Sequence, residues 1–360
     1  MKRIHLIISL LMFLSSCGGD VVYRIDGKLA NLEDQHIYAV FESEDRNVVD
    51  SVVCDKPGQF RIKQEQTDFR QVTLFFEDRT RWFTIYLEPN EKVTLTGDVQ
   101  QSYMLHAKGG RLNNELSAVR KQLASLLKEQ EDLRQRMQNE TQPSNDLTSR
   151  QANVNHRLNE EVLGYIQNHP DEAASVVLMK TFLLNPDDTR QLDELLILLD
   201  PKLKDFYLVK ELEQYSARAK RTALGAEAPN FTVKNIYGQT LSLDSFPKKY
   251  LLLTFTAPWC DMCQTDDLYL DEIDRAYPED KLQQLLVSLD DDMTALREVL
   301  RRDSIQWNLV ADSAGQATLL VDLYNVSALP RCFLIDEEGT IILKTENGAE
   351  IKRTLENLIR

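Results

Sequence analysis

The sequence predicts three folded regions: a small all-β sandwich, a helical segment and a C-terminal α/β domain. Short β-forming runs separated by turn residues fill residues 21–99. Apolar residues at three- and four-residue steps dominate residues 113–220, as in amphipathic helices. Beyond residue 224, strand-like and helix-like runs alternate, which is typical of an α/β fold. A chain of 360 residues is long enough for two or three domains, and we place them at residues 17–105, 106–221 and 222–360.

Residues 1–16 have the composition of a signal peptide rather than of a folded element. Lys2 and Arg3 form a basic start, and the apolar run through Leu14 is too short to span a bilayer. The Leu-Ser-Ser-Cys stretch that ends at Cys17 resembles a bacterial lipobox. That resemblance implies cleavage before Cys17 and lipid attachment to it, which would anchor the protein to a membrane in the cell envelope. An ordinary secretory signal is the alternative.

The N-terminal β region consists of short alternating runs punctuated by turn residues such as Lys56-Pro57-Gly58. Runs at this spacing favour a small β-sandwich. Because the region contains no group of residues with an evident catalytic chemistry, we expect it to act as a spacer or a docking module. The predicted strands are Gln35–Phe41, Val48–Cys54, Gln59–Ile62, Val72–Phe76 and Thr84–Leu87.

The middle of the chain predicts helices. An apolar stripe runs from Leu116 to Met137, and a second runs from Val154 to Ile166. Two amphipathic helices joined by a short loop indicate a helical hairpin, followed by shorter helices that prolines separate. The alternative is a partner-binding coiled coil, but the stripe lasts too few heptads to require one.

The C-terminal region predicts an alternating order of strands and helices, then a hairpin and a last helix. The expected elements are a hairpin of Phe231–Val233 with Leu241–Leu243, strands Leu251–Thr256 and Gln284–Leu289, a helix from Asp290 through Leu300, strand Trp307–Ala311, helix Ala317–Tyr324, strands Arg331–Asp336 and Ile341–Lys344, and a helix from Ile351 to Ile359.

Charge and cysteine content limit the function. The chain has 42 basic and 57 acidic residues, a net charge of −15, which argues against nucleic acid as a partner and against electrostatic docking on anionic lipid. Five cysteines are too few and too scattered for a disulfide framework. Cys17 is assigned to lipid, and Cys54 and Cys332 remain as isolated thiols.

The remaining cysteines form the motif that predicts the chemistry. The apolar strand Leu251–Thr256 leads through Trp259 into Cys260 and Cys263, two residues apart, and a helical pattern follows. Thiols at a helix N-terminus lie near unpaired N–H groups, which favour the reactive thiolate. We therefore expect Cys260, the outer thiol, to attack a disulfide and Cys263, about one turn further in, to resolve the mixed disulfide.

The segment from Trp259 to Cys263 resembles the active site of thioredoxin-like proteins. The stretches Gly225–Phe231 and Tyr324–Pro330 strengthen the match to an envelope-anchored branch that includes reductases of cytochrome c maturation. That branch lies within the superfamily of alkyl hydroperoxide reductase and thiol-specific antioxidant proteins. The order of Gly27, Asp50-Ser51, Gly58-Gln59-Phe60 and Leu87-Glu88-Pro89-Asn90 is also similar to an uncharacterised domain that precedes many envelope thioredoxin-like domains.

The resemblance implies further site residues. Pro330, after Leu329, matches a cis-proline that offers backbone groups to a substrate segment, and a cis bond costs little at proline. Asp266 matches an acidic position that tunes the proton of the inner cysteine, although two exposed charges with Asp267 are the alternative. Trp259 would lie beside the site and contact substrate, with core packing as an equal alternative. Thr254 stands where thioredoxin itself has a buried Asp, and Cys332 is expected to be a small buried side chain.

We therefore predict a lipid-anchored thiol–disulfide oxidoreductase that exchanges disulfides with envelope proteins. Its partners would be protein disulfides or dithiols and an upstream electron donor, with no cofactor. A zinc site is disfavoured because there is no second Cys pair and no histidine in the C-terminal region. A thiol peroxidase is the first alternative, although a Pro-x-x-x-Thr-x-x-Cys pattern is not present around Cys260. A non-enzymatic binding module is the other.

Overall fold

The computed structural model describes most of the chain, and it forms two compact units. One unit contains residues 1–165 and 172–174, and the other contains residues 166–171 and 175–360; each is described by itself. The described residues are 23–32, 36–42, 47–54, 56–64, 71–76, 81–88, 90–139, 144–260, 263, 269–290, 308–311 and 315–359.

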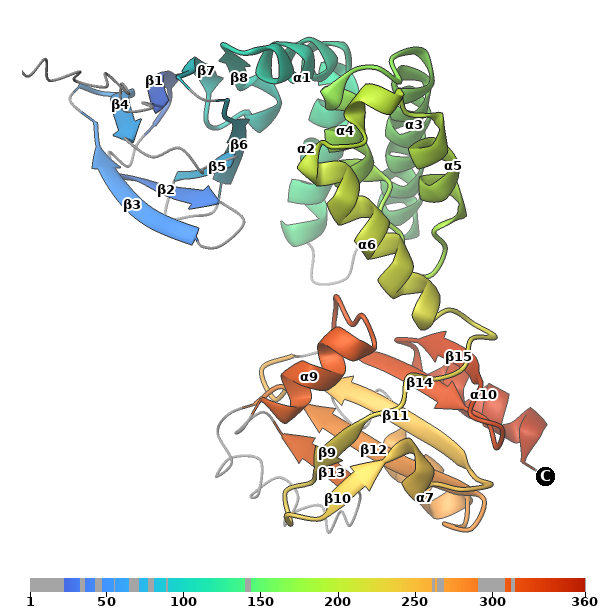
Figure 1. Ribbon diagram of the computed structural model, residues 1–360. Helices are drawn as coiled ribbons and strands as arrows, with labels where there is room; N and C mark the ends of the chain where they lie inside the picture. Colours follow the sequence, from blue (N-terminus) through green and yellow to red (C-terminus); the bar gives the residue numbers. More distant parts are fainter. Residues whose placement is uncertain are drawn as a thin grey trace, which may run out of the picture. The chain divides into compact units, whose positions relative to one another are not determined.

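The N-terminal β region is a sandwich of two four-stranded sheets (Figure 1). Their orders are β4-β1-β7-β8 and β3-β2-β5-β6, and side chains from both sheets form one apolar core. Gly27 lies opposite Phe60, whose ring fills the space that a Cβ at Gly27 would need. The predicted sandwich is confirmed. Its strands are β1 Tyr23–Ala30, β2 His36–Glu42, β3 Asn47–Val53, β4 Gln59–Gln64, β5 Gln71–Phe76, β6 Arg81–Tyr86, β7 Lys92–Asp98 and β8 His106–Lys108.

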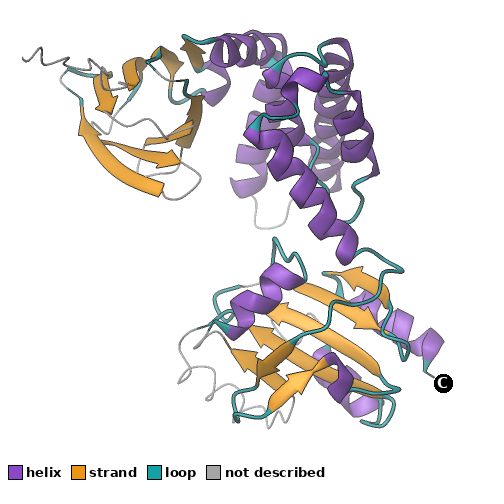
Figure 2. Cartoon of the chain, viewed as in Figure 1, coloured by secondary structure: helices purple, strands orange, loops and turns teal. Residues whose placement is uncertain are grey.

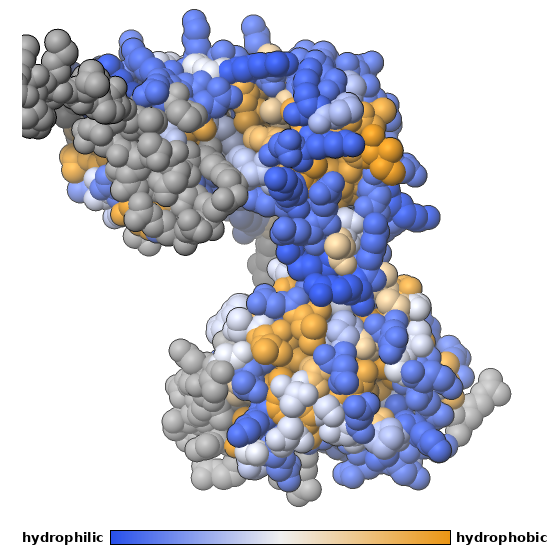
Figure 3. Space-filling view, in the orientation of Figure 1, coloured by the Kyte–Doolittle hydropathy of each residue, from blue (hydrophilic) through white to orange (hydrophobic). Residues whose placement is uncertain are grey.

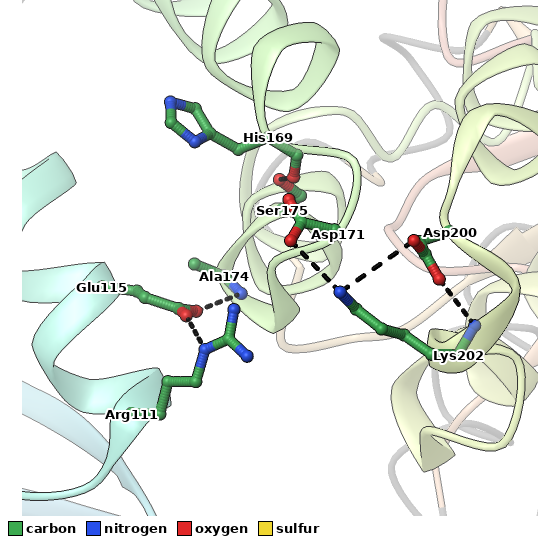
Figure 4. A network of polar contacts seen from close by, with 8 residues as sticks. All are labelled: Arg111, Glu115, His169, Asp171, Ala174, Ser175, Asp200 and Lys202. Carbon is green, nitrogen blue, oxygen red and sulfur yellow. Dashed lines mark hydrogen bonds and ion pairs between the residues drawn. The ribbon is translucent and has the colours of Figure 1, made fainter.

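Three helices complete the first unit: α1 (Arg111–Gln122), α2 (Ala124–Asn139) and most of α3 (Asn145–Asn168). The first apolar stripe, expected as one helix, is divided between α1 and α2 at Leu123. Figure 4 shows an ion pair on α1, where Arg111 contacts the Glu115 carboxylate at 2.6 Å and the Ala174 N–H also donates to that carboxylate.

The second unit begins with shorter helices: α4 (Ala173–Phe182), α5 (Arg190–Leu198) and α6 (Tyr207–Arg221). Lys202, between α5 and α6, lies between two carboxylates, 3.1 Å from Asp171 and 3.9 Å from Asp200 (Figure 4). Asp200 also accepts a hydrogen bond from the Lys202 N–H, which starts the turn before α6. Hydrophilic residues cover most of the visible surface of the helical segment (Figure 3).

The C-terminal region is built on a five-stranded sheet of order β13-β12-β11-β14-β15 (Figure 2). Its central strand, β11, pairs in parallel with β12 and antiparallel with β14. A separate hairpin of β9 and β10 precedes it, as the sequence predicts. The strands are β9 Thr232–Lys234, β10 Thr240–Ser242, β11 Tyr250–Thr256, β12 Leu282–Ser288, β13 Asn308–Ala311, β14 Arg331–Ile335 and β15 Ile341–Thr345.

Helices cover both faces of this sheet. Side chains of α9 (Gln316–Leu323) share a core with Leu253 and Phe255 on one face. Side chains of α7 (Leu270–Ala276) and α10 (Gly348–Leu358) pack with Leu252 on the other face. Alternate residues of β11 therefore serve two apolar cores, which explains why it is buried without interruption from Leu251 to Phe255. This α/β/α arrangement confirms the predicted thioredoxin-like fold.

Some predicted elements lie outside the described residues, including the helix after Asp290 and the segment that contains Cys17. Among the described residues, no helix combines the length and the apolar character that crossing a membrane requires.

Candidate active site

The central strand of the sheet positions the cysteine motif. β11 is buried from Leu251 to Phe255 and ends at Thr256, after which the chain leaves the sheet. The carbonyl of Thr256 accepts a hydrogen bond from the Leu289 N–H, which fixes the strand end against the end of β12. A short turn follows, in which the Cys260 N–H donates to the Ala257 carbonyl. The motif is therefore held at the end of a strand that both cores immobilise.

Cys260 and Cys263 form a disulfide, with their Cα atoms 5.2 Å apart. The Cys263 N–H donates to the Cys260 carbonyl at 2.9 Å, which closes the turn between them. Cys260 is partly exposed, whereas Cys263 is only 6% exposed. This asymmetry fits an accessible attacking thiol and a protected resolving thiol.

Trp259 extends into solvent beside the cysteines. It is 68% exposed, so core packing does not account for it, and this alternative from the sequence is wrong. A large aromatic ring at the rim of a reactive turn is instead available for contact with a substrate.

Pro330 lies at the end of the sheet where β11 ends and the chain continues to the cysteine motif. The Leu329–Pro330 bond is cis, as the sequence predicts, and Pro330 is buried while Leu329 is partly exposed. β14 starts at the next residue, Arg331, which pairs with Phe255 on β11. Continuing this antiparallel register brings Pro330 level with Thr256, so two segments far apart in sequence meet at one edge.

Three predicted site features lie outside the described residues. These are Asp266, Asp267 beside it, and the first turn after Cys263, where a helix start was expected to favour the Cys260 thiolate. From Leu270 onward, α7 has the helical structure that the apolar pattern predicts.

Cys332 behaves as the small buried side chain that the sequence predicts. It is buried on β14, opposite Thr254 on β11, and it is not part of a disulfide. Burial raises the pKa of the Cys332 thiol to about 12. The thiol is thus neutral near neutral pH, which excludes the nucleophilic chemistry that needs a thiolate.

Two cations of the C-terminal sheet lie outside the predicted site residues. Arg331 and Lys344 are charged residues within otherwise apolar strands, and both are largely buried. Their ion-pair partner, Asp187, is more than 140 positions away in sequence. The signal that could have revealed them is the charge itself, because a lone cation inside a buried strand needs a counter-charge.

The described residues contain no group of three or more His, Cys, Asp or Glu side chains that could hold a metal ion. The described site does contain a disulfide, an exposed aromatic ring and a cis-proline at one edge of a thioredoxin-like fold. This combination defines the class of thiol–disulfide exchange proteins.

Comparison with known proteins agrees with this class. Residues 224–344 match the AhpC/TSA family, and residues 23–116 match a domain of unknown function, DUF4369. The C-terminal region is therefore an AhpC/TSA thioredoxin-like domain, and the N-terminal region carries a domain without an assigned function.

Relatives that match this chain in sequence are named as thiol-disulfide oxidoreductases. The thiol-disulfide oxidoreductase ResA of Bacillus cereus is 27% identical over 146 residues, which are 41% of this chain and 82% of that protein. The names of these relatives confirm the predicted enzyme class, thiol–disulfide oxidoreductase.

Solved structures also resemble parts of the chain. A thiol-disulfide oxidoreductase from Bacteroides fragilis is 29% identical, covers 37% of this chain and 99% of its own, and has a TM-score of 0.33. A thioredoxin-like protein from Bacteroides caccae is 20% identical, covers 59% of this chain and 82% of its own, and has a TM-score of 0.43.

Proposed function

We propose that the protein reduces or exchanges disulfides of other proteins through Cys260 and Cys263. The observation that carries the proposal is the Cys260–Cys263 disulfide, with one cysteine partly exposed and the other buried. In the reductive direction, the Cys260 thiolate attacks a substrate disulfide, and a substrate thiolate leaves. Cys263 then attacks the Cys260 sulfur, which forms the internal disulfide and releases the second substrate thiolate. Two electrons pass to the substrate, and its two thiolates take up protons.

The other site residues have supporting roles in this proposal. Trp259, Leu329 and Pro330 contact the substrate segment, because they border the motif and include its exposed ring and the cis bond. Asp266 holds or releases the proton of the inner thiol, Cys263, as the resemblance implies. An upstream dithiol donor restores the reduced pair after each cycle, because the step above consumes two electrons.

Trapping of the mixed disulfide tests the proposed order of attack. In Cys263→Ser, Cys260 still attacks but no resolving thiol is present, so we expect covalent complexes with substrate proteins. Non-reducing gels followed by mass spectrometry would reveal these complexes and identify the substrates.

The matched control is Cys260→Ser, which should trap few or no proteins because the buried thiol lacks access. Equal trapping by both variants would reverse or remove the role assignment. If neither variant traps a protein, the site is a binding module rather than an exchange enzyme.

We further propose that lipid at Cys17 anchors the mature protein in the cell envelope, facing the periplasm or the cell surface. The lipobox-like stretch before Cys17 supports this proposal. Cys17→Ser should move the protein from the membrane fraction to the soluble envelope fraction. A variant that still sediments with membranes after a salt wash would contradict anchoring at this residue.

A further inference from the structure

A single carboxylate on the helical segment pairs with two cations of the C-terminal sheet. Asp187 lies in the connection between α4 and α5. Its Oδ1 is 2.9 Å from Nζ of Lys344 on β15, and its Oδ2 is 3.6 Å from Nη1 of Arg331 on β14. Lys344 also donates to the Pro186 carbonyl at 2.8 Å. Both sets of residues belong to the second compact unit.

The two cations are almost removed from water. The side chain of Lys344 is 3% exposed and that of Arg331 is 11% exposed, whereas Asp187 is 50% exposed. Phe333 pairs with Lys344 across the strands, and the Lys344 ammonium lies 5.8 Å from the centroid of the Phe333 ring. Arg331 and Phe333 are two residues apart on β14, so all three side chains share one face of the sheet.

Such burial makes the counter-charge important. A buried ammonium or guanidinium is costly unless it is paired and hydrogen-bonded. In the described part of the chain, Asp187 is the carboxylate within ion-pair distance of either cation. Without the Asp187 carboxylate, the positive charges of Arg331 and Lys344 would lie near each other in a poorly hydrated site. Hydration of the Arg331 guanidinium would then draw this side chain away from the sheet.

Movement of Arg331 would reach the cysteine site directly. Arg331 is the first residue of β14, and the residue before it is Pro330, at the edge that the Cys260–Cys263 turn adjoins. The backbone of Leu329 and Pro330 is the surface to which a substrate segment would bind under the proposed function.

We propose that Asp187 is a positioning residue for substrate binding: it holds Arg331 and Lys344 in place and thereby fixes the Leu329–Pro330 edge. This inference depends on the proposed disulfide exchange. It also extends the enzyme beyond the thioredoxin-like fold, because the connection between α4 and α5 becomes part of the framework of the site.

Asp187→Asn in the full-length chain tests the inference, with reduced enzyme and insulin as the protein-disulfide substrate. We expect KM to rise about five- to ten-fold, the change that corresponds to losing one partly buried ion pair, with kcat unchanged. The Cys260–Cys263 disulfide should react with dithiothreitol at the wild-type rate, because this small reagent does not need the Leu329–Pro330 edge. Asp187→Glu, which keeps the charge, should restore most of the affinity.

The matched control is Glu211→Gln, which breaks an exposed ion pair with Lys180 on the same helical segment and should leave KM unchanged. A KM for Asp187→Asn equal to that of wild type would overturn the inference while leaving disulfide exchange intact. If wild-type protein itself fails to reduce insulin, the proposed function fails instead.

Should Asp187→Asn fold poorly, the double variant Asp187→Asn with Lys344→Met removes the unpaired ammonium and leaves Arg331 without its partner. A raised KM in this variant supports the inference, and a wild-type KM overturns it.

Discussion

The two β regions of the molecule bury their strands in different ways. In the sandwich, β1, β2 and β5 alternate between buried and partly or fully exposed positions, because each sheet has one covered face. In the C-terminal domain, β11 is buried at five consecutive positions, because helices cover both faces. A strand covered on both faces leaves only its end accessible, and that end is where Cys260 and Cys263 follow. The comparison shows why the reactive turn belongs to one region and not to the other.

Charged residues also have different surroundings in the two regions. In the sandwich, Asp26 lies among three cations, Arg24, Arg61 and Lys92, at the partly exposed side of β1. In the C-terminal domain one carboxylate, Asp187, also pairs with more than one cation, but there the two cations are largely buried. The first cluster bears on the stability of the sandwich, whereas the second includes Arg331, the residue after Pro330, and under the proposal made above it positions the substrate-binding edge.

The largest expected effect tests whether each region has its own core. Phe333→Ala removes a fully buried ring that lies 5.2 Å from Tyr324 and 6.0 Å from Phe255, centroid to centroid. We expect it to lower the free energy of unfolding of the C-terminal domain by about 3–5 kcal/mol. Native-state hydrogen exchange, followed separately in residues 23–98 and 250–345, measures this change.

The matched change in the sandwich is Phe41→Ala, also fully buried. It should reduce protection in residues 23–98 and leave residues 250–345 as in wild type. If each variant lowers protection in both regions equally, the two cores unfold as one cooperative unit and the comparison drawn above fails.

The sequence predicted the features that depend on local pattern. Period-2 runs gave most strands of the sandwich, the apolar run Leu251–Thr256 gave β11, and the Cys-x-x-Cys spacing gave the disulfide pair. The cis bond before Pro330 also followed from local sequence together with the resemblance. These features are determined by residues that are close together in the chain.

Pairings between distant residues were not predictable from one sequence. No local pattern connects Asp187 with Lys344, and nothing in the stripe after Leu116 marks the division of the helix at Leu123. The exposure of Trp259 likewise depends on what packs around it, so its sequence context left two alternatives. All three features, the ion pair, the division of the helix and the exposure of the ring, depend on contacts between residues that are distant in sequence.

The next effect in size concerns Asp26. Burial raises the pKa of Asp26, but hydrogen bonds from Arg61 and Arg24 outweigh it, and the net shift is downward from 3.8. A lowered pKa in the folded state means that the stabilisation is complete above the unfolded-state pKa and is lost as pH falls through the folded-state pKa. Asp26→Asn should therefore lower the free energy of unfolding by about 1 kcal/mol at pH 7, because the surrounding cations are partly exposed and solvent screens the pairs.

Urea unfolding of the two proteins at several pH values measures this dependence. The difference between variant and wild type should shrink below about pH 4 and disappear at lower pH, where Asp26 is protonated. Asp132→Asn, which breaks an exposed pair with Lys128 on α2, is the control and should change little at any pH. A difference that stays constant down to pH 2 would mean that the carboxylate charge is not the stabilising feature.

The smallest expected effect concerns the buried thiols, one in each region. Cys54 lies in the core of the sandwich and Cys332 in the core of the C-terminal domain, two residues beyond Pro330. Because burial raises the Cys332 pKa to about 12, only about one thiol in 10⁴ is ionised at pH 8. Native protein with the Cys260–Cys263 disulfide intact should therefore resist iodoacetamide at Cys332, and urea-unfolded protein should react.

Cys332→Ala should leave insulin reduction unchanged, since a neutral buried thiol cannot take part in exchange. Two outcomes would contradict this: alkylation of native Cys332 as fast as in the unfolded chain, or loss of activity in the folded variant. Either would make Cys332 a third redox thiol, so that a residue inside the sheet would take part in the exchange now assigned to Cys260 and Cys263.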